Sequence, residues 1–285
     1  MEVTLLGTGS PVPLPNRAGS SVLIEIGGNR LLFDCGPGSM HRMVENGITP
    51  GSIDALFFTH HHIDHNADFY YFVITNWTRG EDELSIFGPQ PTTDTLLSSM
   101  YEIYEEDIEY RTSARSDPEM IENIPTHEVK DEATFSATEW TVEAFAVEHS
   151  IETYGFMITE ESTGSTTVIS GDTKKTDSVI QAANNADLLI QDCSIAPPSG
   201  DPQRPEDEFV WDNYITGIST NKKDRIAEVH CTAEQCGEIA TQSDVDTLVL
   251  THLLPYRDKN STKEIIQTAY DGNIIIGEDG MVFSV

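Results

Sequence analysis

A cluster of side chains suited to metal binding follows a short apolar stretch early in the chain. Residues 54–58 have the composition of a buried strand, and residues 59–65 read Thr-His-His-His-Ile-Asp-His. Imidazole and carboxylate groups are good zinc ligands, and an open coordination position on such an ion activates water. If the chain turns where the strand ends, His60 and His62 can point to one side and Asp64 and His65 to the other. This pattern predicts two metal ions rather than one; a histidine-rich surface loop is the simpler alternative.

Three further candidate ligands lie downstream, and each stands after a predicted strand. His149, Asp172 and His252 all follow apolar runs that are rich in β-branched or aromatic residues. Strand ends that converge at one edge of a sheet are where α/β proteins build their sites. A single histidine or aspartate after a strand is usually structural. Three such placements together with the cluster indicate one shared site.

With these residues the chain resembles the metallo-β-lactamase superfamily, and more closely its ribonuclease Z and arylsulfatase-like branch. The resemblance extends over nearly the whole chain and rests on an ordered set of motifs: Leu6–Ser10, Leu32–Gly38, Thr59–His65, His149 with Tyr154–Phe156, Ser170–Thr173, His230–Gln235 and Leu250–Leu253. Any one motif alone would be weak evidence. The resemblance implies an α/β fold, namely a four-layer αββα sandwich in which each half of the chain supplies one sheet.

The resemblance also assigns the predicted ligands to two divalent ions: His60, His62 and His149 to the first, Asp64, His65 and His252 to the second, and Asp172 to both as a bridge. Zinc is the expected metal, with manganese or iron as alternatives. Asp34 is expected to support a bound histidine rather than to bind an ion itself. The loop containing Gly7 and Gly9 is expected to form a tight turn at the floor of the site, since no phosphate-binding Gly-Lys-Ser/Thr follows it.

The chemistry implied is two-metal hydrolysis, in which a metal-bound hydroxide attacks a phosphorus or sulfur centre. Asp64 would orient the nucleophile or accept its proton. His230, which stands at a predicted helix start and is not needed as a ligand, is the candidate to protonate the leaving oxygen. A hydrogen-bonded structural histidine is the alternative for His230. Asp192 stands where the family pattern has a glutamate, and it is expected to support His230 with a shorter reach.

Predicted strands alternate with predicted helices along the 285 residues, which favours an α/β sheet with helices outside it. The predicted strands cover 3–6, 21–26, 30–33, 84–87, 142–147, 154–158, 166–170, 188–191, 247–250 and 273–276, and the predicted helices cover 39–46, 66–77, 92–106, 175–184, 233–242 and 261–270. We predict a single domain over residues 1–285. His149 and Asp172 are only 172 − 149 = 23 positions apart, which leaves room for a hairpin but not for the long arm that grips tRNA in family enzymes.

The charge of the chain is its second strong feature. Forty-eight acidic and 16 basic residues give a net charge of −32, and the acids are spread along the whole sequence. That spread, together with an apolar content of 38%, excludes a disordered acidic tail. A surplus of this size repels itself unless salt screens it. We therefore predict a halophilic protein, with an ordinary acidic protein as the alternative.

The same charge bears on the substrate, because a nucleic-acid enzyme normally presents a basic stripe to phosphates. Basic residues gather only at 174–175, 222–225 and 257–259. They could hold a phosphate near the metals, but the favoured interpretation is that they only reduce the repulsion between acidic groups on the surface. A small phosphate ester or nucleotide is therefore favoured over RNA. The alternatives are a tRNA 3′-processing endonuclease, an arylsulfatase, and a metal-binding family member with little activity.

Several features indicate a cytoplasmic protein with no membrane contact. No signal peptide is visible, and the apolar runs are too short to span a bilayer. The four cysteines show no Cys-x-x-Cys spacing and are expected to be reduced: Cys35, Cys193, Cys231 and Cys236.

Some parts of the sequence receive no definite role. The segment 101–122 is very acidic, and the aromatic residues of 196–221 could form a lid, a pocket wall or a homodimer contact. An irregular stretch of that length is usually functional or disordered. His41, His61 and His127 are interpreted as surface or packing residues.

Overall fold

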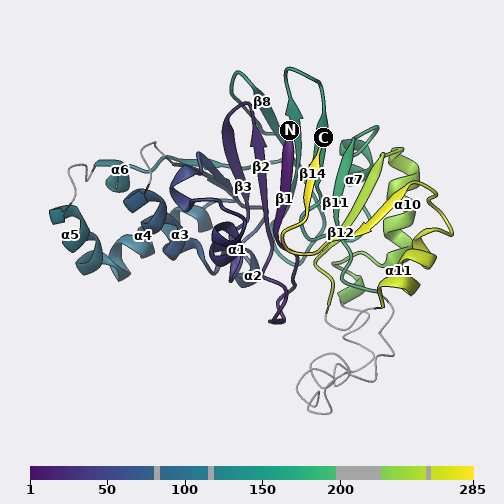
Figure 1. Cartoon of the computed structure of the whole chain (residues 1–285), viewed down its shortest axis with the longest axis horizontal. Coiled ribbons are helices and arrows are strands. Elements are labelled where there is room, and N and C mark those ends of the chain that lie inside the picture. Colours follow the sequence, from purple (N-terminus) through teal and green to yellow (C-terminus); the bar gives the residue numbers. More distant parts are fainter. Residues whose placement is uncertain (80–83, 115–118, 197–225, 255–257) are drawn as a thin grey trace, which may run out of the picture.

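Two seven-stranded sheets stand together at the centre of the structure (Figure 1). The structure is a computed structural model that describes residues 1–79, 84–114, 119–196, 226–254 and 258–285. The first sheet contains, in spatial order, β14 (Val282–Ser284), β1 (Glu2–Gly7), β2 (Ser21–Ile26), β3 (Asn29–Phe33), β4 (Ala55–Phe57), β5 (Ser85–Gly88) and β6 (Thr126–Glu128). The second contains β13 (Asn273–Ile276), β12 (Thr247–Thr251), β11 (Leu188–Asp192), β10 (Thr166–Ile169), β9 (Tyr154–Glu160), β8 (Trp140–Ala146) and β7 (Thr134–Ser136).

Helices cover the outer face of each sheet. Beside the first sheet lie α1 (Ser39–Glu45), the 3-10 turn η1 (Pro50–Ser52), α2 (Ile63–Asn66), α3 (Phe69–Arg79), α4 (Thr92–Ile103) and α6 (Glu119–Glu122), and α5 (Glu105–Ala114) lies farther out, next to α4. Beside the second lie α7 (Asp177–Ala182), α10 (Ala233–Ser243) and α11 (Lys259–Ile266). The two groups of helices occupy opposite sides of the paired sheets in Figure 1, and this arrangement confirms the predicted four-layer αββα sandwich.

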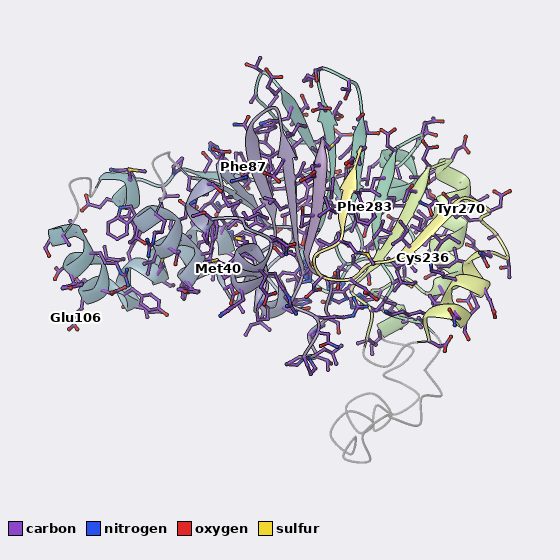
Figure 2. All side chains as sticks on the ribbon, in the orientation of Figure 1. Met40, Phe87, Glu106, Cys236, Tyr270 and Phe283 are labelled. Carbon is purple, nitrogen blue, oxygen red and sulfur yellow. The ribbon has the colours of Figure 1, made fainter. Side chains whose placement is uncertain are left out.

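Apolar packing follows the same layers. Between the sheets, the rings of Phe33, Phe57 and Phe87 stack in a row with centroids 5.0 and 4.3 Å apart, and Phe156 of the second sheet meets Phe57 at 5.7 Å. On its outer side, each sheet packs against its helices through an apolar layer of its own. Figure 2 shows Met40 in the layer of the first sheet and Cys236 in the layer of the second. Full burial of an aromatic or aliphatic side chain stabilises the fold by about 1.5–3 kcal/mol. Burial on both faces explains why most strands read as continuous apolar runs.

Parallel strands lead to the predicted site. Strands β3 to β6 run parallel in the first sheet, and β10 to β13 run parallel in the second. His60 and Asp64 follow the C-terminal end of β4, Asp172 follows β10, and His252 follows β12. The two sheets therefore deliver their chemical side chains at strand ends, which is the part of an α/β sheet where ligands bind.

The structure also differs from the predicted elements at several places. Strands β6, β7 and β14 were not predicted, and the predicted helix 92–106 is replaced by α4 followed by a separate α5. The described part of 101–122 is helical, whereas most of 196–221 lies outside the described residues. A β9–β10 hairpin makes up most of the connection between His149 and Asp172. The single-domain assignment of 1–285 stays a prediction.

Among the residues that the structure describes, none of the helices combines the length and hydropathy that crossing a membrane requires.

Candidate metal centre

The strand-end loops bring together the four residues predicted to hold the first ion. Nε2 of His60 lies 3.1 Å from Nδ1 of His62, which lies 3.2 Å from Nε2 of His149. Oδ2 of Asp172 is 3.8 Å from the His60 nitrogen and 3.9 Å from the His149 nitrogen. His60 and Asp172 are buried, and the other two histidines are half-buried. Three nitrogens and one carboxylate oxygen thus converge on a common point.

Asp64, His65 and His252 form a second group beside the first. Nε2 of His252 lies 3.1 Å from Oδ2 of Asp64 and 3.2 Å from Oδ2 of Asp172. Nε2 of His65 lies 3.7 and 3.4 Å from the same two oxygens. Oδ2 of Asp172 therefore stands next to both groups, which is where a ligand that bridges two ions would be.

The spacing of these atoms fits divalent ions. With metal–ligand bonds of about 2.0–2.1 Å, the corners of a tetrahedron are about 3.4 Å apart, and the observed separations run from 3.1 to 3.9 Å. Nε2 of His65 is buried and makes no hydrogen bond within the described residues, although it faces the carboxylates of Asp64 and Asp172. Its lone pair is free for a metal ion. The residues therefore fit a pair of divalent ions, and their roles as ligands stay predictions.

Electrostatics point the same way. Burial lowers the pKa of His65, but the carboxylates of Asp172 and Asp34 outweigh it and raise that pKa well above its ordinary value. The same balance of burial against Asp172 raises the pKa of His252 to about 10. Burial would raise the pKa of Asp172, yet the imidazoles of His252 and His65 hold it well below its ordinary value. The buried carboxylates therefore favour positive charge at this centre, and bound divalent ions supply that charge in place of protons on the imidazoles.

Asp34 lies behind the second group. Its Oδ2 accepts hydrogen bonds from Nδ1 of His65 at 2.7 Å and from Oγ1 of Thr59 at 2.8 Å, while its Oδ1 accepts one from the Thr59 main-chain nitrogen at 2.9 Å. Oγ1 of Thr59 is also 3.0 Å from Nδ1 of His60. Contacts of this kind fix the orientation and tautomer of a metal-binding histidine. Sequence reasoning anticipated a supporting position for Asp34 but missed Thr59, which immediately precedes the histidine motif.

His230 reaches the same centre from the turn before α10. Its Nδ1 donates to Oδ2 of Asp192 at 2.8 Å, and its ring stacks on that of His252 with centroids 5.2 Å apart. Burial lowers the pKa of His230, but the Asp192 carboxylate outweighs burial and raises it. Donor atoms of Asp172, His230 and His252 lie within 4.8 Å of one another. Asp192 thus makes the contact with His230 that the sequence predicts, and His230 is close enough to act on a molecule held by the ions.

Asp279 anchors the loop beneath the site, and sequence reasoning missed it. Its Oδ1 accepts from the main-chain nitrogen and Oγ1 of Thr8 at 3.0 and 2.7 Å, and its Oδ2 accepts from Arg42 Nε at 2.9 Å. The Thr8 carbonyl in turn accepts from the main-chain nitrogen of His252 at 3.2 Å. A Cβ on Gly7 would lie 1.7 Å from a neighbouring carbonyl oxygen, so the tight turn needs glycine there. No sequence pattern identifies Asp279, because its position depends on the C-terminal segment returning to β1.

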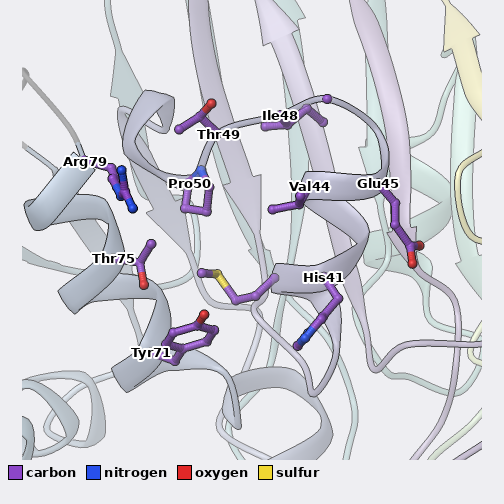
Figure 3. Close-up of a pocket in the computed structure, with 11 residues that line it drawn as sticks. His41, Val44, Glu45, Ile48, Thr49, Pro50, Tyr71, Thr75 and Arg79 are labelled. Carbon is purple, nitrogen blue, oxygen red and sulfur yellow. The ribbon is translucent and has the colours of Figure 1, made fainter.

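The histidines that received no role have packing contacts. Nε2 of His61 lies 2.9 Å from Oγ1 of Thr93, and the ring of His127 stacks on Phe87 at 4.5 Å. His41 lines a separate pocket of about 610 Å³ (Figure 3). The pocket is walled by α1, the loop after it, η1 and α3: Met40, His41, Val44, Glu45, Gly47, Ile48, Thr49, Pro50, Tyr71, Thr75 and Arg79. It contains no member of the two metal groups.

Comparison with known proteins shows the family of this chain. The matching family model is described as Anti-Pycsar protein Apyc1 and covers residues 1–201. Ribonuclease Z of Mycobacterium bovis is 30% identical over 288 aligned positions, which cover 98% of this chain and 96% of that protein. Ribonuclease Z of Mycolicibacterium gilvum is 31% identical, with 98% and 94% covered. The chain belongs to the ribonuclease Z-like branch of the metallo-β-lactamase superfamily. As a member of this branch it is a hydrolase, and the resemblance stated from its motifs is confirmed.

Solved structures agree on the fold. The metallo-β-lactamase fold protein YhfI from Bacillus subtilis superposes on this ribonuclease Z-like chain with a TM-score of 0.73 at 23% identity, covering 99% of each chain. The short form of human tRNase Z gives a TM-score of 0.70 at 22% identity, covering 100% of this chain and 99% of that one. Both likenesses support the αββα sandwich and no finer point.

Proposed function

We propose that this chain is a binuclear phosphodiesterase that uses zinc and cleaves small phosphate esters or nucleotides. The observation that carries the proposal is the position of Asp172, whose Oδ2 stands within 3.9 Å of nitrogens from both ligand groups. Two separate single-ion sites would not need that shared oxygen. Nitrogen and carboxylate donors at tetrahedral spacing favour zinc, with manganese or iron as alternatives. The relatives named ribonuclease Z support a phosphodiester bond as the target.

The residues of the chain have distinct tasks in this reaction. When bound, the two ions supply a lowered pKa for water and offset the negative charge that develops on phosphoryl oxygens. The Asp64 carboxylate orients the attacking water or accepts its proton. His230 protonates the leaving oxygen from Nε2, because Asp192 holds its Nδ1. The raised pKa of His230 keeps its acidic form populated near neutral pH.

Charge and shape favour a small substrate. The chain carries a net charge of −32, and the lysines that follow Asp172 in the sequence have acidic partners: Lys174 pairs with Glu148 at 2.5 Å and Lys175 with Glu238 at 2.6 Å. These lysines stand beside carboxylates rather than in the basic stripe that nucleic acid requires. The short β9–β10 hairpin supports the absence of a tRNA-gripping arm at this position. We further propose that the protein is halophilic, which its net charge supports, and cytoplasmic, which the four buried free thiols support.

A direct test uses bis(p-nitrophenyl) phosphate in molar KCl with zinc. We expect turnover by the wild type, complete loss in His62→Ala and Asp172→Ala, and full activity in His127→Ala, because His127 is an exposed histidine that belongs to neither ligand group. Elemental analysis of the same samples should find two ions per wild-type chain. Hydrolysis of p-nitrophenyl sulfate in preference to the phosphate diester would instead identify an arylsulfatase. No turnover of either ester by a protein that holds two ions would contradict the proposed activity.

One observation favours a second candidate function, tRNA 3′-processing. The relatives that cover nearly the whole chain are named ribonuclease Z. Incubating precursor tRNA with the zinc-loaded protein in molar KCl distinguishes the two functions. Cleavage at the 3′ side would establish tRNA processing, whereas an intact precursor together with rapid ester turnover would exclude it.

A further inference from the structure

The carboxylate of Asp192 serves two histidines rather than one. Its Oδ2 accepts from Nδ1 of His230 at 2.8 Å. Its Oδ1 accepts from the hydroxyl of Ser194 at 2.8 Å and from the Ser194 main-chain nitrogen at 3.0 Å. The same hydroxyl oxygen lies 2.8 Å from Nδ1 of His252, the predicted ligand of the second ion. Asp192 and Ser194 are 2% and 1% exposed, so water does not compete for these contacts.

The hydrogen inventory of Ser194 gives this arrangement a direction. A serine hydroxyl donates one hydrogen bond and accepts two, and an ionised carboxylate only accepts. The one hydroxyl hydrogen of Ser194 has two acceptors within reach, Oδ1 of Asp192 at 2.8 Å and the main-chain carbonyl of His252 at 3.0 Å. With the hydrogen directed at either oxygen, and most closely at Asp192, the Ser194 oxygen accepts the proton on Nδ1 of His252. The Nε2 lone pair of His252 then faces Oδ2 of Asp64 and of Asp172, 3.1 and 3.2 Å away, where an ion would be bound.

The other predicted histidine ligands have supports of their own. Nδ1 of His65 is held by Asp34 at 2.7 Å, and Nδ1 of His149 by the Val229 carbonyl at 2.9 Å. Nδ1 of His60 lies 3.0 Å from Oγ1 of Thr59, and Nε2 of His62 lies 3.3 Å from Oγ of Ser150. Within the described residues, His252 alone shares its supporting carboxylate with His230.

We propose that Ser194 is a positioning residue that joins the second ion subsite to the leaving-group acid through Asp192. The Ser194 hydroxyl fixes the ring orientation and the tautomer of His252, and it donates to the Asp192 oxygen that His230 does not contact. The Asp192 carboxylate therefore orients both imidazoles. The inference rests on the proposed function for the role of His230, but its effect on ion binding stands apart from any substrate. Supporting contacts of this kind change metal affinity about 10–100-fold when removed.

Zinc titration against a chromophoric chelator tests the proposal without substrate. We expect Ser194→Ala to weaken one of the two ions about 10–100-fold and to leave the other unchanged, because none of the described contacts of Ser194 reaches His60, His62 or His149. Ser194→Thr keeps the hydroxyl and should restore wild-type binding. Ser243→Ala is the matched control, since Ser243 is equally buried but donates only to a helix carbonyl.

Two-bond ¹H–¹⁵N spectra of the zinc-loaded protein give a second readout. The wild type and Ser194→Thr should show His252 protonated at Nδ1, and Ser194→Ala should lose that signal or broaden it. Wild-type affinity of both ions in Ser194→Ala, equal weakening of both, or failure of threonine to restore binding would each overturn the proposal. A wild type that binds two ions but hydrolyses no ester would contradict the proposed function while leaving the Ser194 result decisive.

Discussion

Replacing Asp34 is the sharpest test of how this chain prepares a metal site. Asp34 is 3% exposed, accepts three hydrogen bonds, and has a φ of 60°, in the left-handed region that disfavours most side chains. Asp34→Gly removes the carboxylate but relieves the backbone, whereas Asp34→Ala removes the carboxylate and keeps the strain. Because left-handed backbone costs about 1–2 kcal/mol without glycine, the alanine variant should unfold more easily than the glycine variant by about that amount.

The loss common to both variants comes from the buried donors of Thr59 and His65. Each buried donor left without a partner costs about 1–3 kcal/mol. Burial raises the pKa of Asp34 above its ordinary value, so removing the charge returns part of this cost, and we expect a net loss of about 2–4 kcal/mol for the glycine variant. Free rotation of His65 should also weaken the second ion about 10–100-fold, which corresponds to about 1.4–2.7 kcal/mol.

Urea unfolding of the metal-free protein at constant KCl measures the free energy of unfolding, and chelator competition measures the affinity for the second ion. Asp187→Asn is the control, because Asp187 accepts hydrogen bonds from Thr166 and has no contact with the ligand groups. Wild-type binding of both ions by Asp34→Gly would refute the supporting role of Asp34. Equal stability of the glycine and alanine variants would refute the argument from φ.

Three further predictions follow from the charge and burial of the chain. Chelation should lower the free energy of unfolding by about 2.7 kcal/mol for each site previously held at 100 times its dissociation constant, and a chelator without effect in thermal unfolding would contradict structural metal binding. Raising KCl from about 0.1 to about 1 M shortens the screening length from about 10 to about 3 Å, so the melting temperature should rise; a fall would contradict salt adaptation. A thiol reagent should modify none of the four cysteines in the folded protein and all four in denaturant, because all are buried and burial raises the pKa of Cys35 and Cys236.

The metal groups could be predicted from the sequence because their geometry is largely local. His60, His62, Asp64 and His65 lie within six residues of one another, so one turn after β4 fixes their relative positions. The more distant ligands could be found because each follows a strand, and these strands leave apolar or alternating runs in the sequence. Strand ends in one sheet meet at one edge, which makes sequence position informative about space.

Elements whose position depends on distant partners could not be predicted. Strand β14 has only three residues and is held by pairing with β1, and so short a run shows too little alternation to predict a strand. Asp279 secures Thr8 for the same reason, through a contact between opposite ends of the chain. Helix α5 has no buried residues, so its sequence lacks the apolar periodicity that predicts a helix. Ser194 stands two residues after Asp192, but only the side-chain distances show that it links Asp192 to His252.

The salt concentration determines how strongly the acidic surface affects the choice of substrate. At low ionic strength a net charge of −32 repels phosphates over many ångströms, and this repulsion disfavours RNA strongly. In molar KCl the screening length is about 3 Å, so the repulsion acts only at contact. The release of counterions, which drives most protein–nucleic acid binding, weakens at the same salt concentration. Long-range electrostatic forces then do not select the substrate. The bound ions and the side chains that contact a substrate held by them determine the selection. In that setting the short β9–β10 hairpin argues more strongly against tRNA than the charge does, and only a cleavage assay in molar KCl weighs the two fairly.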